Sequence, residues 1–161
     1  MLSETPDARE TLLLADAIRL AVDNAAAGQL PFGALVFRDG EVLATGVNTA
    51  RRDTDPTAHA EVAAVRAACR ALGTEDLTGA TVVSSCEPCA MCHAVCAAVG
   101  VSRILYAAAK EDVPDLGGAA RPLLVQMQVA LRGLDPGEIR QVPVDGHREP
   151  FRRYLEVVGE R

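Results

Sequence analysis

One stretch, residues 57–108, decides the fold: it reads TAHAEVAAVRAACRAL (57–72), TVVS (81–84), PCAMCHAVCAAV (88–99) and RILYAA (103–108). The first and third segments are rich in alanine and space their apolar residues as a helix does. The second and fourth segments are short and apolar, which is typical of buried strands. We therefore predict two helices that alternate with two strands over this stretch.

Residues at the helix ends support these limits. Thr57 is placed to cap the first helix, and Gly73 follows its last residue. Pro88 suits the first turn of the second helix, where its missing N–H costs nothing. Alternating helices and strands indicate a mainly parallel sheet that is covered on both faces.

The flanking sequence completes the predicted domain. Apolar runs over Ala34–Phe37 and Val42–Val47 flank Asp39-Gly40, which is typical of a β-hairpin. The remaining predicted elements are a helix over Glu10–Ala27, loops over Asn48–Asp55 and Pro114–Ala120, a helix over Leu123–Leu131, a strand over Glu138–Val144 and a helix over Glu149–Val158. The predicted fold class is a three-layer α/β/α domain with a mixed five-stranded sheet and an N-terminal antiparallel hairpin. We expect a single domain over residues 1–161, with residues 1–7 as a flexible tail.

Composition predicts a core of small side chains in a cytoplasmic protein. Hydrophobic residues make up 49% of the chain but aromatic residues only 3%, so alanine and valine must fill the interior. The N-terminus lacks a basic segment followed by an apolar run, so we expect no secretory signal. No apolar stretch reaches the length of a membrane span. Four of the five cysteines fall within residues 86–96, which in such a chain indicates metal binding rather than disulfides.

The net charge argues against a nucleic-acid partner. The formal charge is −6 and the sequence pI is near 5.0, whereas affinity for nucleic acid depends on neutralising phosphates with Lys and Arg. Arg148, Arg152 and Arg153 form the best basic cluster, and such a cluster is more often a solvated helix face. We therefore expect a small-molecule partner.

Three residues have the chemistry of a catalytic zinc site. Zinc is held by imidazole nitrogen and thiolate sulfur, and catalytic sites keep three protein ligands and an open position. Cys89 and Cys92 are three residues apart at the start of a predicted helix, so both thiolates project from one face. With His59 they form the predicted ligand set for one Zn²⁺. We expect His93 and His147 not to be ligands.

Glu61 is the predicted catalytic residue. It lies two residues after His59, where it can take a proton from water and deliver it to a ring nitrogen and to leaving ammonia. The pattern H-x-E followed by P-C-x-x-C resembles a known zinc-deaminase signature. The alternative class is a non-enzymatic zinc-structured domain, in which Glu61 would have no catalytic role.

An iron–sulfur cluster is the alternative metal centre that the spacing of these cysteines allows. Cys86, Cys89, Cys92 and Cys96 reproduce the bacterial ferredoxin spacing for an iron–sulfur cluster. Ala97 stands where that run carries proline, and no second cysteine run is present. The apolar pattern of residues 90–99 also favours a packed helix over a loop that wraps a cluster. Zinc is therefore the preferred hypothesis.

The motifs together resemble a known family. The quoted matches are Pro31-Phe32-Gly33-Ala34, Asn48, the run from Asp55 to Val62, Ala67-Ala68-Cys69, Leu72-Gly73, the run from Ser85 to Cys92, and Pro150-Phe151. On these residues the chain resembles the cytidine deaminase-like superfamily, and within it the guanine deaminase branch. The resemblance implies zinc-dependent hydrolytic deamination of a nucleobase or nucleoside, and a homodimer.

The resemblance also implies substrate contacts. Asn48 would hydrogen-bond the base edge and Phe32 would wall the base pocket, although a turn asparagine and a plain core phenylalanine are the alternatives. Ala58, Ser85 and Cys86 would present backbone groups near the metal and the substrate. Glu87 would have a structural role in its loop.

One departure from the family concerns substrate choice. Guanine deaminases carry Gly-Phe-Asp-Asp where this chain has Gly117-Gly118-Ala119-Ala120, and Ala98 replaces a family tryptophan. Asp112 or Asp115 would have to supply the missing acid. A guanine-like purine is the first expected substrate. The alternatives are cytosine, a nucleoside or a specialised metabolite, and an adenosine in tRNA.

Overall fold

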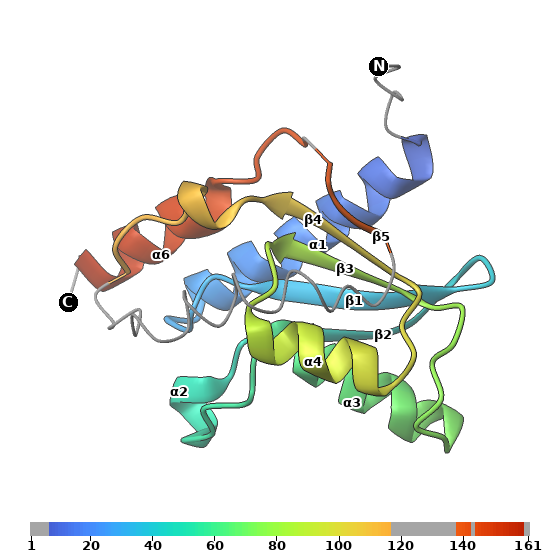
Figure 1. Cartoon of the computed structure of the whole chain (residues 1–161). Helices are drawn as coiled ribbons and strands as arrows, with labels where there is room; N and C mark the ends of the chain where they lie inside the picture. Colours follow the sequence, from blue (N-terminus) through green and yellow to red (C-terminus); the bar gives the residue numbers. More distant parts are fainter. Residues whose placement is uncertain (1–6, 117–137, 143, 160–161) are drawn as a thin grey trace.

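A mixed five-stranded sheet forms the centre of the molecule (Figure 1). The computed structural model describes residues 7–116, 138–142 and 144–159. The strands are β1 (Gly33–Arg38), β2 (Glu41–Val47), β3 (Thr81–Cys86), β4 (Arg103–Ala108) and β5 (Glu138–Gln141), in the order β2-β1-β3-β4-β5. β1 is antiparallel to β2 and β3, whereas β3, β4 and β5 are parallel. The predicted sheet, with its N-terminal hairpin, is confirmed.

Helices cover both faces of the sheet and complete the predicted three layers (Figure 1). The helical elements are α1 (Ala8–Ala26), α2 (Ala50–Asp53), α3 (Ala60–Leu72), α4 (Ala90–Ala98), the 3₁₀ turn η1 (Lys110–Asp112) and α6 (Glu149–Gly159). α3 and α4 pack on one face, while α1 packs on the other and is in turn contacted by α6.

Consecutive residues of β3 and β4 pack on opposite faces of the sheet. Val82 and Ile104 belong to the core beneath α3 and α4, whereas Val83 and Leu105 belong to the core beneath α1. This alternation follows from the two-residue period of a strand. Both sets are buried, as expected of parallel strands that are covered on both sides.

Two glycines let helices lie very close to the sheet. A Cβ atom at Gly46 would lie 2.4 Å from the carbonyl oxygen of Ala60, in the first turn of α3. A Cβ atom at Gly33 would lie 2.6 Å from the carbonyl oxygen of Ala17 in α1. Backbone atoms occupy the space that any side chain would need. The small residues at these positions therefore allow the backbones of α3 and α1 to lie close to the strands on which they pack.

Two predicted helix starts were wrong, and one short helix was not predicted. α3 begins at Ala60 with His59 as its N-cap, because Asp55 Oδ1 already accepts hydrogen bonds from Thr57 N (2.8 Å) and Oγ1 (2.7 Å). α4 begins at Ala90 with Cys89 as its N-cap, so Pro88 precedes the helix. The segment predicted as a loop over residues 48–55 contains the short helix α2.

The chain ends also differ from expectation. Asp7 caps α1, because its Oδ1 accepts a hydrogen bond from Arg9 N at 3.1 Å. β5 ends at Gln141 rather than at Val144. The predicted helix over 123–131, residues 117–120 and the tail over 1–6 lie outside the described residues. Among the helices that the structure describes, none combines the length and the apolar character that crossing a membrane requires.

Candidate functional site

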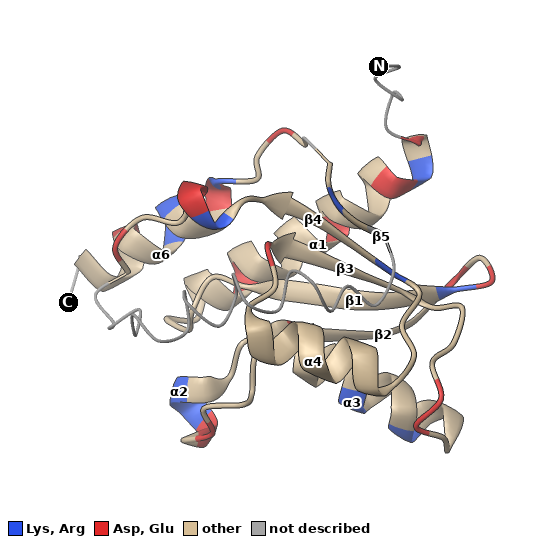
Figure 2. Cartoon of the chain, in the orientation of Figure 1, with Lys and Arg blue, Asp and Glu red and all other residues tan. Residues whose placement is uncertain are grey.

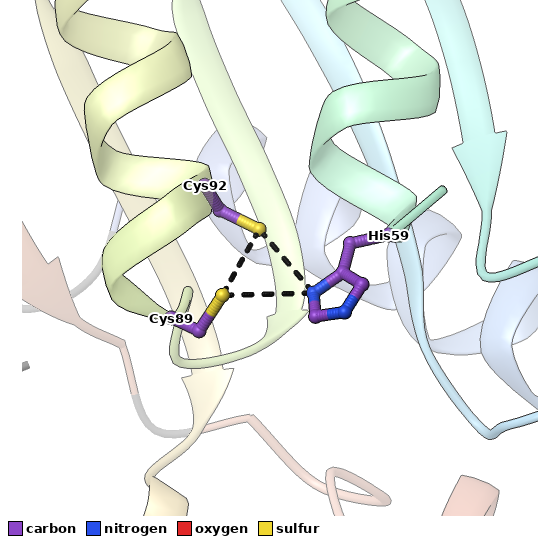
Figure 3. Close-up of side chains that lie close together, drawn as sticks. All are labelled: His59, Cys89 and Cys92. Carbon is purple, nitrogen blue, oxygen red and sulfur yellow. Dashed lines mark hydrogen bonds between the residues drawn. The ribbon is translucent and has the colours of Figure 1, made fainter. Parts of the chain in front are cut away.

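Two adjacent helix starts bring the predicted zinc ligands together (Figure 3). His59 is the N-cap of α3, Cys89 is the N-cap of α4, and Cys92 lies in the first turn of α4. The two N-caps have extended backbone, with ψ of 158° at His59 and 171° at Cys89. The side chains therefore converge in front of two helix N-termini, where the helix dipoles favour negative charge.

The three donor atoms have the spacing of a tetrahedral site. Cys89 Sγ and Cys92 Sγ each lie 3.6 Å from His59 Nδ1, and the two sulfurs lie 3.6 Å apart. Zinc bond lengths of about 2.3 Å to sulfur and about 2.0 Å to nitrogen imply separations of about 3.8 Å between sulfurs and about 3.6 Å between sulfur and nitrogen. Both cysteines are free. The donor set therefore fits zinc, and no described fourth protein ligand joins it.

The same three groups share protons. Hydrogen bonds from Cys92 and His59, partly opposed by burial, lower the pKa of Cys89 to about 4. The hydrogen bond to Cys89 raises the pKa of His59, although burial works against it. The Cys89 interaction and burial raise the pKa of Cys92. These pKa shifts favour a thiolate at Cys89 and protons on its two neighbours, and a metal would displace those protons.

Glu61 lies beside this cluster with its carboxylate fixed. Its side chain is only 6% exposed. Oε1 accepts a hydrogen bond of 2.8 Å from Ser84 Oγ on β3, and Oε2 lies 3.3 Å from Cys92 Sγ. Burying a carboxylate costs free energy unless its oxygens have hydrogen-bond partners, and these two contacts supply such partners.

A cleft of about 190 Å³ opens onto the cluster. Its lining residues in the described part of the chain are Leu30, Phe32, Asn48, His59, Glu61, Cys86, Glu87, Cys89, Lys110 and Val113. The list includes Phe32, Asn48 and Cys86, which the resemblance implied. Leu30, Lys110 and Val113 were not predicted, because no local pattern marks loop residues that only tertiary structure brings to a cleft.

Ala58 and Ser85 are not among the described residues that line this cleft. Ser85 Oγ accepts a hydrogen bond of 3.1 Å from Gly33 N, which ties the end of β3 to the start of β1. The Ala58 carbonyl accepts a hydrogen bond of 3.0 Å from Thr49 N. Both residues support the loops around the cleft.

Asn48 is buried and its amide has a defined polarity. It is 3% exposed, and its Oδ1 accepts a hydrogen bond of 3.1 Å from Ala50 N at the start of α2. Its backbone is held on both sides, by Phe32 O and by Asn24 Nδ2. Because the oxygen has a backbone donor, the NH₂ group is the part of this side chain that can donate to a ligand.

The two aspartates proposed to replace the family acid do not line the cleft. Asp112 Oδ2 accepts a hydrogen bond of 3.0 Å from Ala109 N, and Arg148 Nη2 lies 2.5 Å from its Oδ1. The Arg148 hydrogen bond lowers the pKa of Asp112. Asp115 is exposed. The carboxylate of Asp112 therefore fixes η1 and the start of α6.

Comparison with known proteins identifies the family of this site. The family described as "Cytidine and deoxycytidylate deaminase zinc-binding region" matches residues 8–108. That range contains His59, Glu61, Cys89 and Cys92.

The chain belongs to this deaminase family.

Curated proteins that resemble the chain carry names that imply different substrates. Guanine deaminase of Bacillus subtilis is 40% identical over 102 residues, which cover 63% of this chain and 65% of that protein. A tRNA-specific adenosine deaminase of Agrobacterium fabrum is 44% identical over 80 residues, or 50% of this chain and 53% of that one. A tRNA(Ile)-lysidine synthase of Deinococcus deserti is 43% identical over 108 residues, or 66% of this chain and 20% of that one. The chain thus spans less than two thirds of the length of these relatives.

Solved structures of the deaminase family share the fold. A mutant of NE0047 in complex with 8-azaguanine superposes with a TM-score of 0.78 at 26% identity, covering 92% of this chain and 85% of that one. The Bacillus subtilis guanine deaminase gives a TM-score of 0.61 at 30% identity, covering 90% and 92%. A structure from studies of A-to-I editing by tRNA deaminases gives 0.67 at 29% identity, covering 84% and 100%.

The deaminase match and the geometry leave the iron–sulfur alternative unsupported. Cys86 and Cys96 are not part of the described metal-binding group. Burial, with Glu61 nearby, raises the pKa of the Cys86 thiol, and raises that of Cys96 to about 12. These two thiols are therefore buried neutral side chains. His93 and His147 also lie outside the group.

Proposed function

We propose that this chain catalyses zinc-dependent hydrolytic deamination of an amino-bearing nucleobase or related heterocycle, with release of ammonia. One observation carries the proposal: a buried carboxylate, Glu61, lines the same cleft as His59 and Cys89, whose donor atoms are grouped with that of Cys92 at a spacing that suits one metal. His59, Cys89 and Cys92 would hold the zinc. When bound, zinc supplies Lewis acidity that makes water a nucleophile near neutral pH.

Glu61 moves the protons of the reaction. Its Oε1 is held by Ser84, which leaves Oε2 on the side of the metal-binding cysteines. There the carboxylate accepts a proton from the attacking water and delivers it to the ring nitrogen. It then takes the remaining proton of the added hydroxyl group and delivers it to the leaving amine, so that the carbonyl product and ammonia form. Burial strengthens this role, because the charge interacts with fewer competing solvent dipoles.

Asn48 and Phe32 position the ring. The Asn48 NH₂ group donates to an acceptor on the edge of the heterocycle, since its oxygen is engaged with Ala50 N. Phe32 covers a face of the cleft and contacts Phe151 of α6 edge to face, with ring centroids 6.0 Å apart. This packing holds Phe32 in place as an apolar wall.

A small molecule fits the described surface better than tRNA does. Figure 2 shows acidic and basic residues interspersed along α6. The arginines of this region have acidic partners, namely Arg148 with Asp112 at 2.5 Å, Arg152 with Glu156 at 2.7 Å and Arg153 with Glu156 at 3.4 Å. Together with a net charge of −6, these pairs leave little free positive charge for phosphates.

A guanine-like purine is the first substrate to test. The cleft volume of about 190 Å³ is below the range of about 300–1,000 Å³ that holds drug-sized ligands, which favours a compact heterocycle. Cytosine, nucleosides and specialised metabolites form the second group, and adenosine in tRNA the third. We also propose that the chain is one domain and works as a homodimer.

The test is ammonia release from guanine, adenine, cytosine, their nucleosides, pterins and aminotriazines, with the zinc-loaded protein and with Glu61→Gln. We expect Glu61→Gln to keep zinc and to lose turnover by about a thousandfold or more. Glu41→Gln, at an exposed position on β2, is the matched control. Full turnover by Glu61→Gln would refute the assigned role, and tight, salt-sensitive binding of tRNA in a gel shift would favour the editing alternative.

A further inference from the structure

Lys110 is one of the residues that line the cleft. Apart from the metal-binding imidazole of His59, it is the one basic residue among the described residues that line the cleft. Its side chain is only 28% exposed, although it belongs to a short surface turn. The other described residues of the wall include the apolar Leu30, Phe32 and Val113, and the acidic Glu61 and Glu87. A charge in such surroundings interacts more strongly with a ligand than a fully solvated one does.

The ammonium group is available to a ligand. In the part of the chain that the structure describes, its charged partner is Glu111, with Nζ and Oε1 3.5 Å apart. The Glu111 side chain is 69% exposed. An ion pair of this kind contributes little, about 0–1 kcal/mol, because water screens it. Replacing the contact between Lys110 and Glu111 by a contact between Lys110 and a substrate atom therefore costs little free energy.

The backbone that carries Lys110 is fixed at both ends of η1. Lys110 N donates a hydrogen bond of 3.2 Å to Glu87 Oε2, in the loop that leads to Cys89. At the other end, Asp112 accepts from Ala109 N at 3.0 Å and is held by Arg148. Contacts of this kind reduce the conformational freedom that ligand binding would otherwise have to remove.

We infer that Lys110 is a specificity-determining residue that contacts an acceptor oxygen of the substrate. An ammonium group has three donors and no acceptor, so its ligand atom must be an acceptor. The substrates are then heterocycles that carry an oxo or acidic oxygen in addition to the amino group that is lost. This inference rests on the proposed deamination and narrows its substrate class.

The experiment compares substrates that differ by one oxygen. Guanine and 2-aminopurine have the same amino position, and only guanine has the oxo group; cytosine and 4-aminopyrimidine form the equivalent pyrimidine pair. Lys110→Met should lower kcat/KM for the oxo member by about 10- to 100-fold, mainly through KM, and change the other member by less than about threefold. Lys110→Arg should restore most of the loss, and Glu111→Gln is the control that leaves both members unchanged.

A phosphate arm separates the two sources of the oxygen. Nucleosides and their 5′-monophosphates are compared in the same variants. A Lys110→Met loss confined to the monophosphates would assign the oxygen to a phosphate, whereas a loss with the free base would assign it to the ring. Equal losses for both members of every pair, or no loss, would overturn the inference.

Binding measurements separate this inference from the proposed function. Hypoxanthine and purine differ by the same oxo group and need no turnover. Calorimetry with the zinc-loaded protein should show hypoxanthine binding about tenfold or more weaker in Lys110→Met, with purine unchanged. If no substrate releases ammonia but this difference is found, the proposed reaction fails and the Lys110 contact stands; if ammonia is released without this difference, the contact fails alone.

Discussion

The hydroxyl of Ser84 donates a hydrogen bond of 2.8 Å to Glu61 Oε1. Ser84 is 1% exposed at the end of β3, and Glu61 is 6% exposed in the first turn of α3. The central strand therefore orients the carboxylate of a helix that packs on it. A proton-transferring group gains from such an arrangement, because its productive orientation is set before the substrate arrives.

Replacing Ser84 by alanine should lower kcat by about tenfold to a hundredfold while leaving KM and zinc content nearly unchanged. The reason is that Glu61 loses one hydrogen bond that positions its carboxyl group. Steady-state kinetics and zinc analysis on the same preparations measure this effect. Ser102→Ala is the control. The Ser102 hydroxyl accepts a hydrogen bond from Gly79 N, in the segment before β3, whereas the Glu61 carboxylate accepts one from Ser84. A rise in KM with unchanged kcat would show that Ser84 serves the substrate instead.

Cys89→Ala should abolish stoichiometric zinc binding, because two donors remain where three converge within hydrogen-bond range. Cys69→Ala is a matched control, because Cys69 is a half-buried residue of α3 that packs against the core and is not in the group of candidate metal ligands; it should retain one zinc per chain. Metal analysis after gel filtration decides between them. Full zinc content in Cys89→Ala would mean that another residue supplies the ligand.

Gly46→Ala should lower the free energy of unfolding by about 2–4 kcal/mol. The new methyl group would lie 2.4 Å from both Ala60 O and Ala64 N, so α3 must move away from β2. Urea unfolding measures the loss. Gly159→Ala, where nothing lies within 4 Å of the added Cβ, should change stability by less than about 0.5 kcal/mol. Equal stability of the two variants would contradict the close approach.

Glu10 should make stability depend on pH in a defined direction. Burial alone raises its pKa, but hydrogen bonds from Arg103 (2.8 Å) and Arg140 (2.5 Å) outweigh burial and hold the pKa below its ordinary value. A carboxyl whose pKa is lowered by folding stabilises the protein above its unfolded pKa. That contribution is lost as the pH falls through the folded pKa.

Glu10→Gln should therefore be less stable than the unaltered protein at pH 7, by about 1–2 kcal/mol after allowance for solvent screening of the partly exposed arginines. The difference should vanish as the pH falls below the folded pKa. Acid release of zinc affects both proteins, so their difference isolates the Glu10 contribution. A difference that stays constant between pH 7 and pH 3 would contradict this explanation.

The sequence predicted the sheet and the metal-binding residues because both depend on short, regular spacings. The apolar runs at 81–84 and 103–108 are confirmed as parts of β3 and β4. The positions of His59, Cys89 and Cys92 at two helix starts follow from the alternation of helices and strands, and the donor atoms do converge. A three-residue error at Thr57 had little effect, since the helix still begins beside the ligand.

Tertiary contacts decided the features that could not be predicted. Thr57 has the chemistry of an N-cap, but its hydroxyl is engaged elsewhere: it donates to Asp55 Oδ1 and accepts from Arg66 Nη2. Asp112 is an acid in the expected region, but Ala109 N and Arg148 occupy its carboxylate. Lys110 lines the cleft because η1 lies beside the loop of Glu87. The hydrophobic pattern of the sequence does not predict this tertiary contact.

X-ray absorption at the zinc edge tests the central claim most directly, because the account requires one metal with an incomplete protein shell beside Glu61. We predict two sulfur ligands at about 2.3 Å and two nitrogen or oxygen ligands at about 2.0–2.1 Å, one from His59 and one from solvent. Solvent exchange should be detectable as displacement of the light ligand by added substrate or anion. A shell of four protein ligands, or a protein that takes up no zinc, would contradict the account.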